Sequence, residues 1–280
     1  MKLLQEILHG VEVIEVAGST HAAIPNIYFD SRKVVKDALF VAMRGTIFDG
    51  HKYIDQAIEN GAVAIVAEEL LFTKKEGLTY IKVNDSSKAL GVIASNFYDN
   101  PSQKLNLVAV TGTNGKTSVV SLLHQFYQSL AIKTGVLSTV VNKIGLKEVP
   151  STHTTPDALS INKLLSQMVD QGCEFCFMEA SSHAINQNRI SGLQFKGAVF
   201  TNITHDHLDY HKTFDDYILA KKALFDSLPS DAFALVNKDD RHGLNMLIHC
   251  KAKQYTYALK SSADFKARII EHQFDGMLLN

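Results

Sequence analysis

The chain has 280 residues, 46% of them hydrophobic and 20% charged, and its formal net charge at pH 7 is -1. This length accommodates one large domain or two ordinary domains with sizeable cores. A near-neutral chain is poorly suited to binding nucleic acid or a membrane surface, and no apolar run reaches the ~20 residues of a membrane span. We therefore expect neither nucleic acid nor membrane among its partners.

The N-terminus and the cysteines indicate a cytoplasmic protein. The opening MKLLQEILHGVEVIE has one short apolar patch, broken by Gln5 and Glu6, and does not fit a signal peptide. Cys173, Cys176 and Cys250 do not make a disulfide framework. The first two are spaced as in redox and zinc motifs, but CEFCFMEA is typical of a buried strand, on which residues three apart point to opposite faces. We interpret them as core residues.

The first hundred residues predict a small α/β domain. DALFVAM and AVAIVAEE are short apolar runs. Between them, HKYIDQAIENG has helical spacing at Tyr53, Ile54, Ala57 and Ile58, with Gly61 as its stop.

The turn-rich stretch FYDNPSQKLN then marks a domain boundary. We predict an N-terminal α/β domain at residues 1–101 and a central P-loop domain at residues 102–280.

The central domain predicts a mostly parallel sheet flanked by helices. Four apolar runs, LNLVAV, CEFCFMEA, GAVFTNI and AFALVN, alternate with helix-like segments. Each ends in polar residues, namely Thr111–Asn114, Glu179, Thr201–Asn202 and Asn237–Asp240. Because ligands of open α/β sheets bind at the carboxyl ends of the strands, these ends predict one shared cleft.

The run VAVTGTNGKTSVV predicts a phosphate-binding loop. Gly112 and Gly115 permit a tight turn whose N–H groups converge on an anion. Lys116 adds a positive charge, and the Thr117 hydroxyl suits a phosphate-bound Mg²⁺. The match to the usual motif is imperfect, because Val110 stands where that motif has a glycine.

A helix should follow the loop. Apolar residues at positions 119, 122, 123, 126 and 130 predict an amphipathic helix with these side chains on its buried face. The N-terminus of such a helix favours a bound phosphate.

Glu179 ends the second strand, where a buried carboxylate must be solvated, paired or metal-bound. Beside a phosphate loop we favour a role as a Mg²⁺ ligand. The alternative is a plain helix start, capped by Ser181 and Ser182.

Two stretches leave alternatives open. In THDHLDYH, His205, His207, Asp209 and His211 nearly match the HxHxDH pattern of dinuclear zinc hydrolases, with the last histidine one residue late. That interpretation leaves the phosphate loop unexplained.

YILAKKALF predicts a helix with Ile218, Leu219, Ala223 and Leu224 facing inward. Taken alone, this pattern places its two lysines, Lys221 and Lys222, on the solvated surface.

The last residues, FKARIIEHQFDGMLLN, predict two strands around Asp275-Gly276. The chain stops there, so we expect a fragment of a longer protein.

Together these features resemble the Mur ligase family of peptidoglycan synthesis, and within it the members that add the third peptide residue. The resemblance rests on DSRKV and LFVAMRGTIFDGHKYI in the first domain, and on TGTNGKTS, THTTPD, EASSHAINQNRI, TNITHDHLDYH, AKKALF and VNKDD in the second. The first pair is shared with the ligase that adds the terminal dipeptide. THTTPD and SSHAINQNR favour the third-residue branch.

The resemblance implies a role for each matching residue. The implied ATP-binding residues are Gly112, Thr113, Asn114, Gly115, Lys116, Thr117, Ser118 and, near the adenine, Asn237. The implied Mg²⁺ ligands are Thr117 for a first ion and Glu179 with His207 for a second. Lys221 is implied to be carbamylated and to help organise the metal site, which reverses its assignment to the solvated surface, and Lys116, Lys221 and His207 are the implied catalytic residues.

The substrate contacts are implied in the same way. Ser31 would contact the uridine nucleotide, and the muramyl-dipeptide would be held by Thr154, Thr155, Ser181, Gln187 and Arg189. His153 stands where the family has asparagine.

The implied activity is ATP-dependent addition of a diamino acid to UDP-MurNAc-L-Ala-D-Glu through an acyl phosphate. In the family a third domain binds the incoming amino acid, so we expect this chain to fold and to bind the sugar nucleotide as a monomer, without turnover. The identity of the diamino acid stays open. The alternatives are a P-loop nucleotide-binding module without ligase activity and a zinc hydrolase.

Overall fold

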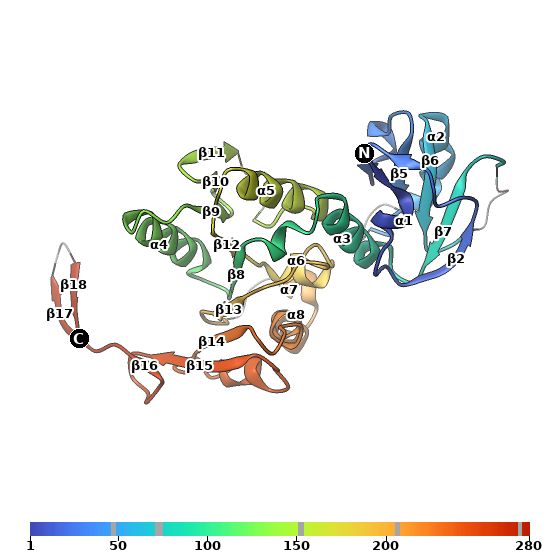
Figure 1. Cartoon of the computed structure of the whole chain (residues 1–280). Coiled ribbons are helices and arrows are strands. Elements are labelled where there is room, and N and C mark those ends of the chain that lie inside the picture. The colour runs from blue at the N-terminus through green and yellow to red at the C-terminus, as the bar shows by residue number, and fades with distance from the viewer. Residues whose placement is uncertain (46–48, 71–74, 151–153, 205–207, 274–275) are drawn as a thin grey trace. The chain divides into compact units, whose positions relative to one another are not determined.

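The computed structural model describes residues 1–45, 49–70, 75–150, 154–204, 208–273 and 276–280, which form two compact units (Figure 1). The N-terminal unit comprises residues 1–101 with the segments Asp157–Ser166 and Gln187–Leu193. The central unit comprises Ser102–Pro156, Gln167–Asn186 and Gln194–Asn280. No helix within the described ranges is long and apolar enough to cross a bilayer.

The N-terminal unit is built on a five-stranded sheet. Its strands, in spatial order, are β2 (Val13–Ala17), β7 (Thr79–Val83), β6 (Ala62–Ala67), β5 (Ala38–Val41) and β4 (Ile27–Tyr28). β2 is antiparallel to β7, and the other neighbours are parallel. The short strands β1 (Lys2–Leu3) and β3 (Ala23–Ile24) pair separately. The helices of this unit are α1 (Leu4–Ile7), α2 (Ile54–Glu59), which follows the 3-10 turn η2 (Gly50–Tyr53), and α3 (Ser86–Phe97).

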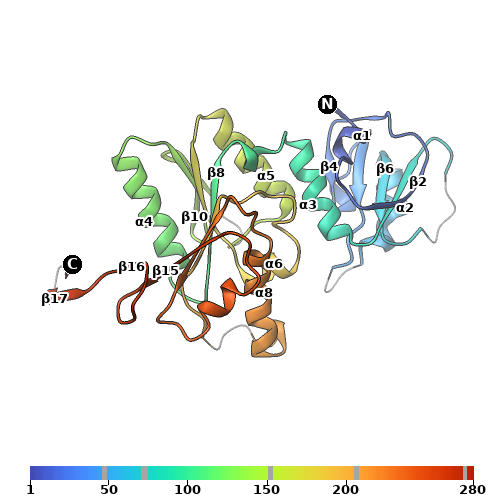
Figure 2. The same ribbon diagram turned by 60° about the horizontal axis from the view of Figure 1, so that its bottom comes forward.

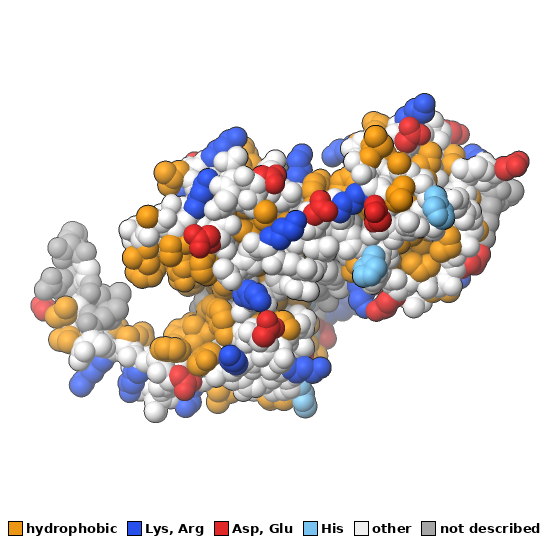
Figure 3. Space-filling model, viewed as in Figure 1, with side chains coloured by type: hydrophobic (Ala, Val, Ile, Leu, Met, Phe, Trp, Pro, Cys, Tyr) orange, Lys and Arg blue, Asp and Glu red, His pale blue; other side chains and the backbone are white. Residues whose placement is uncertain are grey.

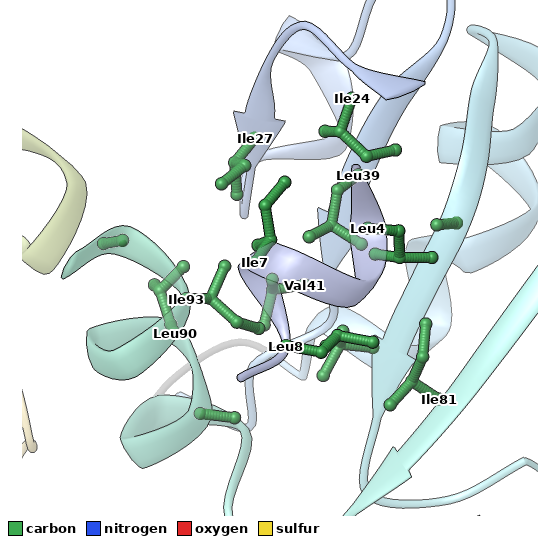
Figure 4. Close-up of a cluster of buried hydrophobic side chains, with 14 of the residues drawn as sticks. Leu4, Ile7, Leu8, Ile24, Ile27, Leu39, Val41, Ile81, Leu90 and Ile93 are labelled. Atoms are coloured by element: carbon green, nitrogen blue, oxygen red, sulfur yellow. The ribbon is translucent and has the colours of Figure 1, made fainter. Parts of the chain in front are cut away.

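A cluster of buried hydrophobic side chains forms the core of this unit. Side chains of α1 lie between Leu90 and Ile93 of α3 and Ile81 of β7 (Figure 4). The helix predicted around residues 53–58 is present as η2 and α2, and Gly61 follows it with a left-handed φ of 106°. A side chain is disfavoured at such a φ, which explains the glycine at the helix end.

The central unit contains the predicted parallel sheet. Its nine strands, in spatial order, are β11 (Lys147–Pro150), β10 (Val141–Ile144), β9 (Thr134–Leu137), β12 (Phe175–Glu179), β8 (Asn106–Thr111), β13 (Gly197–Phe200), β14 (Phe233–Asn237), β15 (Lys253–Ala258) and β16 (Phe265–Lys266). Only the β9–β10 and β10–β11 pairs are antiparallel. The four predicted runs form the adjacent strands β12, β8, β13 and β14. The strand β9, which pairs with β12, and the strand β15, which pairs with β14, were not predicted.

Helices cover both faces of this sheet. The remaining elements are η3 (Pro101–Gln103), α4 (Lys116–Ser129), α6 (Ser182–Asn186), α7 (Leu208–His211), α8 (Phe214–Asp226) and η4 (Leu244–Leu247), together with α5 (Ala158–Asp170), whose residues up to Ser166 belong to the N-terminal unit. α4 lies on one face, and α6 and α8 lie on the other (Figure 2). The predicted C-terminal hairpin is present as β17 (Ile269–Gln273) and β18 (Gly276–Leu279), while Asp275 lies outside the described residues.

The predicted buried face of α4 is partly wrong. Val119 and Leu123 contact the sheet core, but Leu122, Phe126 and Leu130 are 63%, 58% and 55% exposed. Hydrophobic side chains accordingly gather at the surface over α4 (Figure 3).

The physical reason is the aromatic contact that orients the helix. Tyr127 packs on Phe175 and Phe177 of β12, with ring centroids 4.7 and 5.2 Å apart. This contact turns Val120 and His124 inward instead.

The inward face of α8 also differs from the prediction. Ile218 and Leu224 are buried, but Leu219 is 59% exposed and Ala223 is exposed. Tyr217 and Lys221 are buried in their place, at 0% and 1% exposure. The helix therefore turns a polar stripe toward the carboxyl edge of the sheet, which an apolar pattern cannot reveal.

Candidate functional site

The phosphate loop, residues 112–118, begins where β8 ends. Gly112 has a φ of 149°, and a β-carbon there would overlap the Thr201 hydroxyl. Gly115 caps α4 in the left-handed conformation at φ 87°, with open space where a β-carbon would lie. Both glycines are thus required by the backbone, and the second leaves room at the helix N-terminus for an anion.

The end of β13 holds the loop in shape. The Thr113 N–H donates to the Asn202 carbonyl at 2.8 Å, and the Asn114 N–H donates to the Asn202 side-chain oxygen at 2.9 Å. The Thr201 hydroxyl donates to the Asn114 carbonyl at 2.7 Å. The polar residues that end two of the predicted strands therefore meet, and they preorganise the loop backbone.

Two lysines converge on one carbonyl of the loop. The Lys116 ammonium donates to the carbonyl of Gly112 at 2.8 Å and to that of Thr113 at 2.9 Å. Lys221 of α8 donates to the same Gly112 carbonyl at 3.0 Å. Two positive charges thus lie at the loop, and their field favours an anionic ligand.

Lys221 is almost completely buried, at 1% exposure. Its ammonium lies 4.5 Å from the ring centroid of Tyr217, whose hydroxyl lies 3.1 Å from that of Thr113. The assignment to the solvated surface, made from the helical pattern alone, is wrong for Lys221, because the Gly112 carbonyl and the Tyr217 ring together accommodate its charge. Lys222 is half-buried and pairs with Asp226 at 2.5 Å.

Glu179 is fully buried at the end of β12, in register with Val110 of β8. Its carboxylate accepts hydrogen bonds from the Thr117 hydroxyl at 2.8 Å and from the backbone N–H and hydroxyl of Thr139, each at 3.0 Å. The carboxylate is therefore hydrogen-bonded on both oxygens by local donors, one of which belongs to the phosphate loop.

The oxygens of Thr117 and Glu179 suit a magnesium ion. Mg²⁺ prefers carboxylate and hydroxyl oxygens at about 2.0–2.1 Å in an octahedron, which places adjacent ligand oxygens about 2.9 Å apart. The 2.8 Å separation of these two oxygens fits one edge of such an octahedron. His207, the other implied metal ligand, lies outside the described residues.

Thr155 and Ser181 form a second polar group near the end of β12. The Thr155 hydroxyl donates to the Glu179 carbonyl at 2.9 Å and accepts from the Ser181 N–H at 3.2 Å. The Ser181 hydroxyl accepts from the Ala184 N–H at 3.2 Å, so this serine does cap α6. Thr154 is half-buried, and His153 lies outside the described residues.

Gln187 and Arg189 belong to the N-terminal unit. The Arg189 guanidinium donates from Nε and Nη2 to the Gln187 side-chain oxygen, at 3.0 and 2.6 Å. Both are half-buried. The Gln187 side-chain amide thus orients the Arg189 guanidinium.

Ser31 is also in the N-terminal unit, at the start of the 3-10 turn η1 (Ser31–Lys33). Its hydroxyl donates to the Gln56 side chain at 2.7 Å, and its carbonyl accepts from Asn60 at 2.9 Å. The serine is 6% exposed, so α2 holds it firmly.

Asn237 ends β14 and is half-buried. Its amide donates to the Thr201 carbonyl at 2.9 Å, which ties it to the strand that shapes the phosphate loop. Its oxygen accepts from the Asp239 N–H at 3.0 Å. Backbone N–H groups of Lys260 and Ser261 hold the pKa of Asp239 well below its usual range.

The histidine-rich stretch gives no support to a zinc site within the part of the chain that the structure describes. His205 and His207 lie outside it, as does the side chain of Asp209. His211 is 5% exposed, and its Nε2 lies 2.9 Å from the Ser182 hydroxyl. No group of three or more metal-binding side chains occurs among the described residues.

The three cysteines are free and buried. Cys176 lies in β12, whereas Cys173 precedes the strand, which begins at Phe175. Burial raises the pKa of both thiols. A raised pKa disfavours the thiolate that binds metal or reacts, so the interpretation as core residues fits the structure.

Sequence reasoning missed several residues that shape this site. Thr139 follows β9, a strand that was not predicted, and Tyr217 was hidden in the polar part of α8. Thr201 and Asn202 were noted only as a polar strand end. The signal for Thr139 was the short run TGVLST, which has the same pattern of apolar residues followed by hydroxyls.

Two family models match the chain. The Mur ligase middle domain matches residues 110–279, and the Mur ligase family catalytic domain matches residues 23–98. The first match alone covers more than half of the 280 residues.

The curated relatives that resemble the chain are named as ligases. The chain is 54% identical to a UDP-N-acetylmuramoyl-L-alanyl-D-glutamate–2,6-diaminopimelate ligase of Cytophaga hutchinsonii, covering 98% of this chain and 57% of the relative. The ligase of the same name from Bacteroides fragilis is 50% identical, over 99% of this chain and 57% of the relative. The chain thus spans little more than half the length of these relatives.

Solved structures agree on the fold. A structure of UDP-N-acetylmuramoyl-L-alanyl-D-glutamate–2,6-diaminopimelate ligase matches with a TM-score of 0.82 and 28% identity, over all of this chain and 57% of that one. A MurF ligase of Thermotoga maritima in complex with ADP matches with a TM-score of 0.56 and 21% identity, over 91% of this chain and 57% of that one. The phosphate loop, the two matched models and these relatives agree, and the chain belongs to the Mur ligase family.

Proposed function

We propose that the chain binds ATP and UDP-MurNAc-L-Ala-D-Glu for ATP-dependent amide-bond formation during peptidoglycan precursor synthesis, in which a diamino acid is added to the sugar nucleotide, and that the chain alone does not turn over. The relatives that share 50–54% identity are named as ligases of this kind, with 2,6-diaminopimelate as the amine. We take the same amine for this chain. We also propose that the protein is cytoplasmic, because the reaction consumes ATP. We further propose that it acts as a monomer.

One observation carries the proposal. A fully buried glutamate, Glu179, accepts a hydrogen bond from the Thr117 hydroxyl of the phosphate loop, and the Gly112 carbonyl of the same loop accepts from Lys116 and Lys221. This arrangement combines anion binding with oxygen ligands for a divalent cation. A buried carboxylate is costly unless it is hydrogen-bonded, paired or metal-bound, and the Thr117 hydroxyl is one of its hydrogen-bond donors.

The proposed chemistry has two steps. In the first, an oxygen of the D-glutamyl carboxylate bonds to the γ-phosphorus of ATP, the bond to the ADP oxygen breaks, and an acyl phosphate forms. In the second, the amine attacks the acyl carbon, phosphate leaves with the bonding electrons, and the amine releases a proton. Bound Mg²⁺ would neutralise phosphate charge in the first step.

The residues of this chain would bind and orient the reactants. The N–H groups of the phosphate loop and the Lys116 ammonium would hold the phosphates, once Lys116 turns from the Gly112 carbonyl to the ligand. Thr117 and Glu179 would hold Mg²⁺. Because the Thr117 hydroxyl contacts the Glu179 carboxylate directly, we assign both residues to one ion and assign His207 to a second ion.

Lys221 is proposed to carry a carbamate. Its neutral amine would attack carbon dioxide, forming an N–C bond and releasing a proton. The charge argument supports this, because Lys221 and Lys116 both reach the Gly112 carbonyl, and carbamylation would replace a like-charged neighbour by an opposite one. A carbamate resonance in carbon-13 NMR after exposure to labelled bicarbonate, absent in Lys221→Arg, would support the modification, and its absence from wild-type protein would contradict it.

The remaining roles follow the family pattern residue by residue. Ser31 is proposed to contact uridine and Asn237 the adenine. The muramyl-dipeptide is assigned to Thr154, Thr155, Ser181, Gln187 and Arg189. The domain boundary between residues 101 and 102 is part of the same proposal.

The test is calorimetric titration with UDP-MurNAc-L-Ala-D-Glu, with UDP-N-acetylglucosamine as a matched uridine sugar that lacks the dipeptide. We expect binding of the first that is at least ~10-fold tighter, the ratio that 1.4 kcal/mol of extra contacts gives. The rival P-loop module would bind ATP without this preference. Folded protein that binds ATP but treats the two sugars alike would refute the proposed function.

A further inference from the structure

We propose that Asp85 and Asn188 are positioning residues that fix the segment carrying Gln187 and Arg189. The inference rests on the proposed function, since it concerns how these two side chains are presented to the muramyl-dipeptide. It adds two residues to which the family resemblance assigns no role.

The hydrogen bonds of Asp85 connect the two parts. One carboxylate oxygen accepts from the Lys88 N–H at 2.8 Å and caps α3. The other oxygen accepts from the Asn188 side-chain amide at 2.9 Å, 103 residues further along the chain. A single carboxylate thus caps the N-terminus of α3 and holds the segment Gln187–Leu193 on the helix.

The backbone at Asn188 explains why an asparagine stands there. Its φ of 56° is left-handed, a conformation that asparagine accepts more readily than most residues. The Ser191 N–H returns to the Asn188 carbonyl at 3.1 Å. The chain therefore turns sharply between Gln187 and Arg189, and the two side chains meet in the amide–guanidinium contact at 2.6 Å.

A close backbone contact reinforces the same placement. A β-carbon at Gly91 of α3 would overlap the Ser191 carbonyl oxygen, and a β-carbon at Gly192 would lie 2.8 Å from the Gly91 carbonyl oxygen. Glycine inside a helix costs stability relative to alanine. Its presence at position 91 is explained by the need to let the segment lie directly on the helix.

The hydrogen bond between Asp85 and Asn188 can be tested by exchanging the two residue types. Asp85→Asn leaves one side chain that cannot both cap α3 and accept from Asn188, and Asn188→Asp brings two carboxylates together. The double variant restores a donor opposite an acceptor, because the new asparagine donates to the new aspartate. Lys88→Ala, an exposed change on the same helix, is the control.

Binding of UDP-MurNAc-L-Ala-D-Glu gives the first measurement. We expect each single variant to bind about 2- to 10-fold more weakly, the usual effect of one hydrogen bond. The double variant should lose less binding free energy than the two single variants lose together. Affinity for ATP should stay that of the wild type in all variants. Additive losses, or single variants that bind as the wild type does, would overturn the inference.

Hydrogen exchange followed by mass spectrometry gives the second measurement, and it needs no substrate. Peptides covering residues 187–193 should exchange faster in Asp85→Asn and return toward the wild-type rate in the double variant. Unchanged exchange would overturn the positioning role. If exchange responds as expected while folded wild-type protein binds no sugar nucleotide, the positioning role stands and the proposed function fails.

Discussion

The core of the N-terminal unit and the carboxyl edge of the central sheet both exclude water, but they do so with opposite kinds of side chain. In the first, Leu4, Ile7 and Ile93 pack in a cluster of hydrophobic side chains. In the second, Glu179 and Lys221 are buried to the same degree beside the phosphate loop. Buried apolar groups contribute to folding directly, whereas buried charges require donors and acceptors at fixed positions.

The difference teaches where each region is vulnerable. The apolar core is stabilised by buried hydrophobic volume, so a substitution there should lower folding stability and leave ligand binding intact. The charged edge is held by hydrogen bonds to Thr117, Thr139 and Gly112, so a substitution there should weaken ligand binding first.

The largest effect is expected in the apolar core. Ile93 of α3 is fully buried, and Ile93→Ala should lower the free energy of unfolding by about 2–5 kcal/mol, as methylene deletion leaves a cavity. Affinity for ATP, measured under conditions where the variant is folded, should not change. Urea denaturation gives the first quantity and calorimetry the second. Weakened ATP binding by folded Ile93→Ala would break the distinction between the two regions.

A smaller effect is expected from Glu179→Gln at the charged edge. The amide keeps the size of the side chain but removes the charge and offers one acceptor where Glu179 offers two. We expect ATP affinity in the presence of Mg²⁺ to fall at least ~10- to 100-fold, since loss of even an outer-shell partner costs that much. Binding of the sugar nucleotide is the internal control. An unchanged Mg²⁺ requirement would remove Glu179 from the metal site.

The smallest effect concerns His124, the polar exception on the buried side of α4. Its Nδ1 lies 2.7 Å from the Thr134 hydroxyl, and burial, with the charge of Lys143, lowers the pKa of the imidazole below its ordinary 6.5. Below pH 6.5 the unfolded chain binds a proton at His124 that the folded chain does not. The contribution of His124 to the free energy of unfolding should therefore be complete above pH 6.5 and decline as the pH falls.

The matched variant is His124→Gln, which keeps a polar group opposite Thr134. Its free energy of unfolding should lose this dependence between pH 6.5 and 5, where acidic groups are still ionised. An identical pH profile for the two proteins would show that His124 does not titrate differently on folding.

The sequence predicted those parts of the fold that depend on local pattern. The four central strands are apolar runs bounded by turns, and Gly112, Gly115 and Lys116 mark the strand–loop–helix transition. What a pattern cannot decide is which face of a helix meets the sheet. On α4 that choice is made by Tyr127 against Phe175 and Phe177, and the predicted stripe was therefore partly wrong.

The candidate site shows the same limit. Glu179 was recognisable because a carboxylate ends a buried strand. Lys221 looked solvated in isolation, because its burial depends on the Gly112 carbonyl, which is 109 residues away in the chain. Asp85 and Asn188 were assigned no role, since Asp85 lies outside the quoted motifs, Asn188 is an unassigned position within EASSHAINQNRI, and their contact spans 103 residues. Long-range polar contacts of this kind arise from the fold.

The most direct test of the central claim, that Thr117 and Glu179 join a phosphate loop to a divalent cation, is the Mg²⁺ dependence of ATP binding. Calorimetric titration of the wild type with ATP should show saturable one-to-one binding in Mg²⁺ that weakens at least ~10-fold in chelator, the factor given by a loss of 1.4 kcal/mol. Lys116→Ala should abolish it. Equal ATP affinity with and without Mg²⁺, in both wild type and Lys116→Ala, would contradict the account.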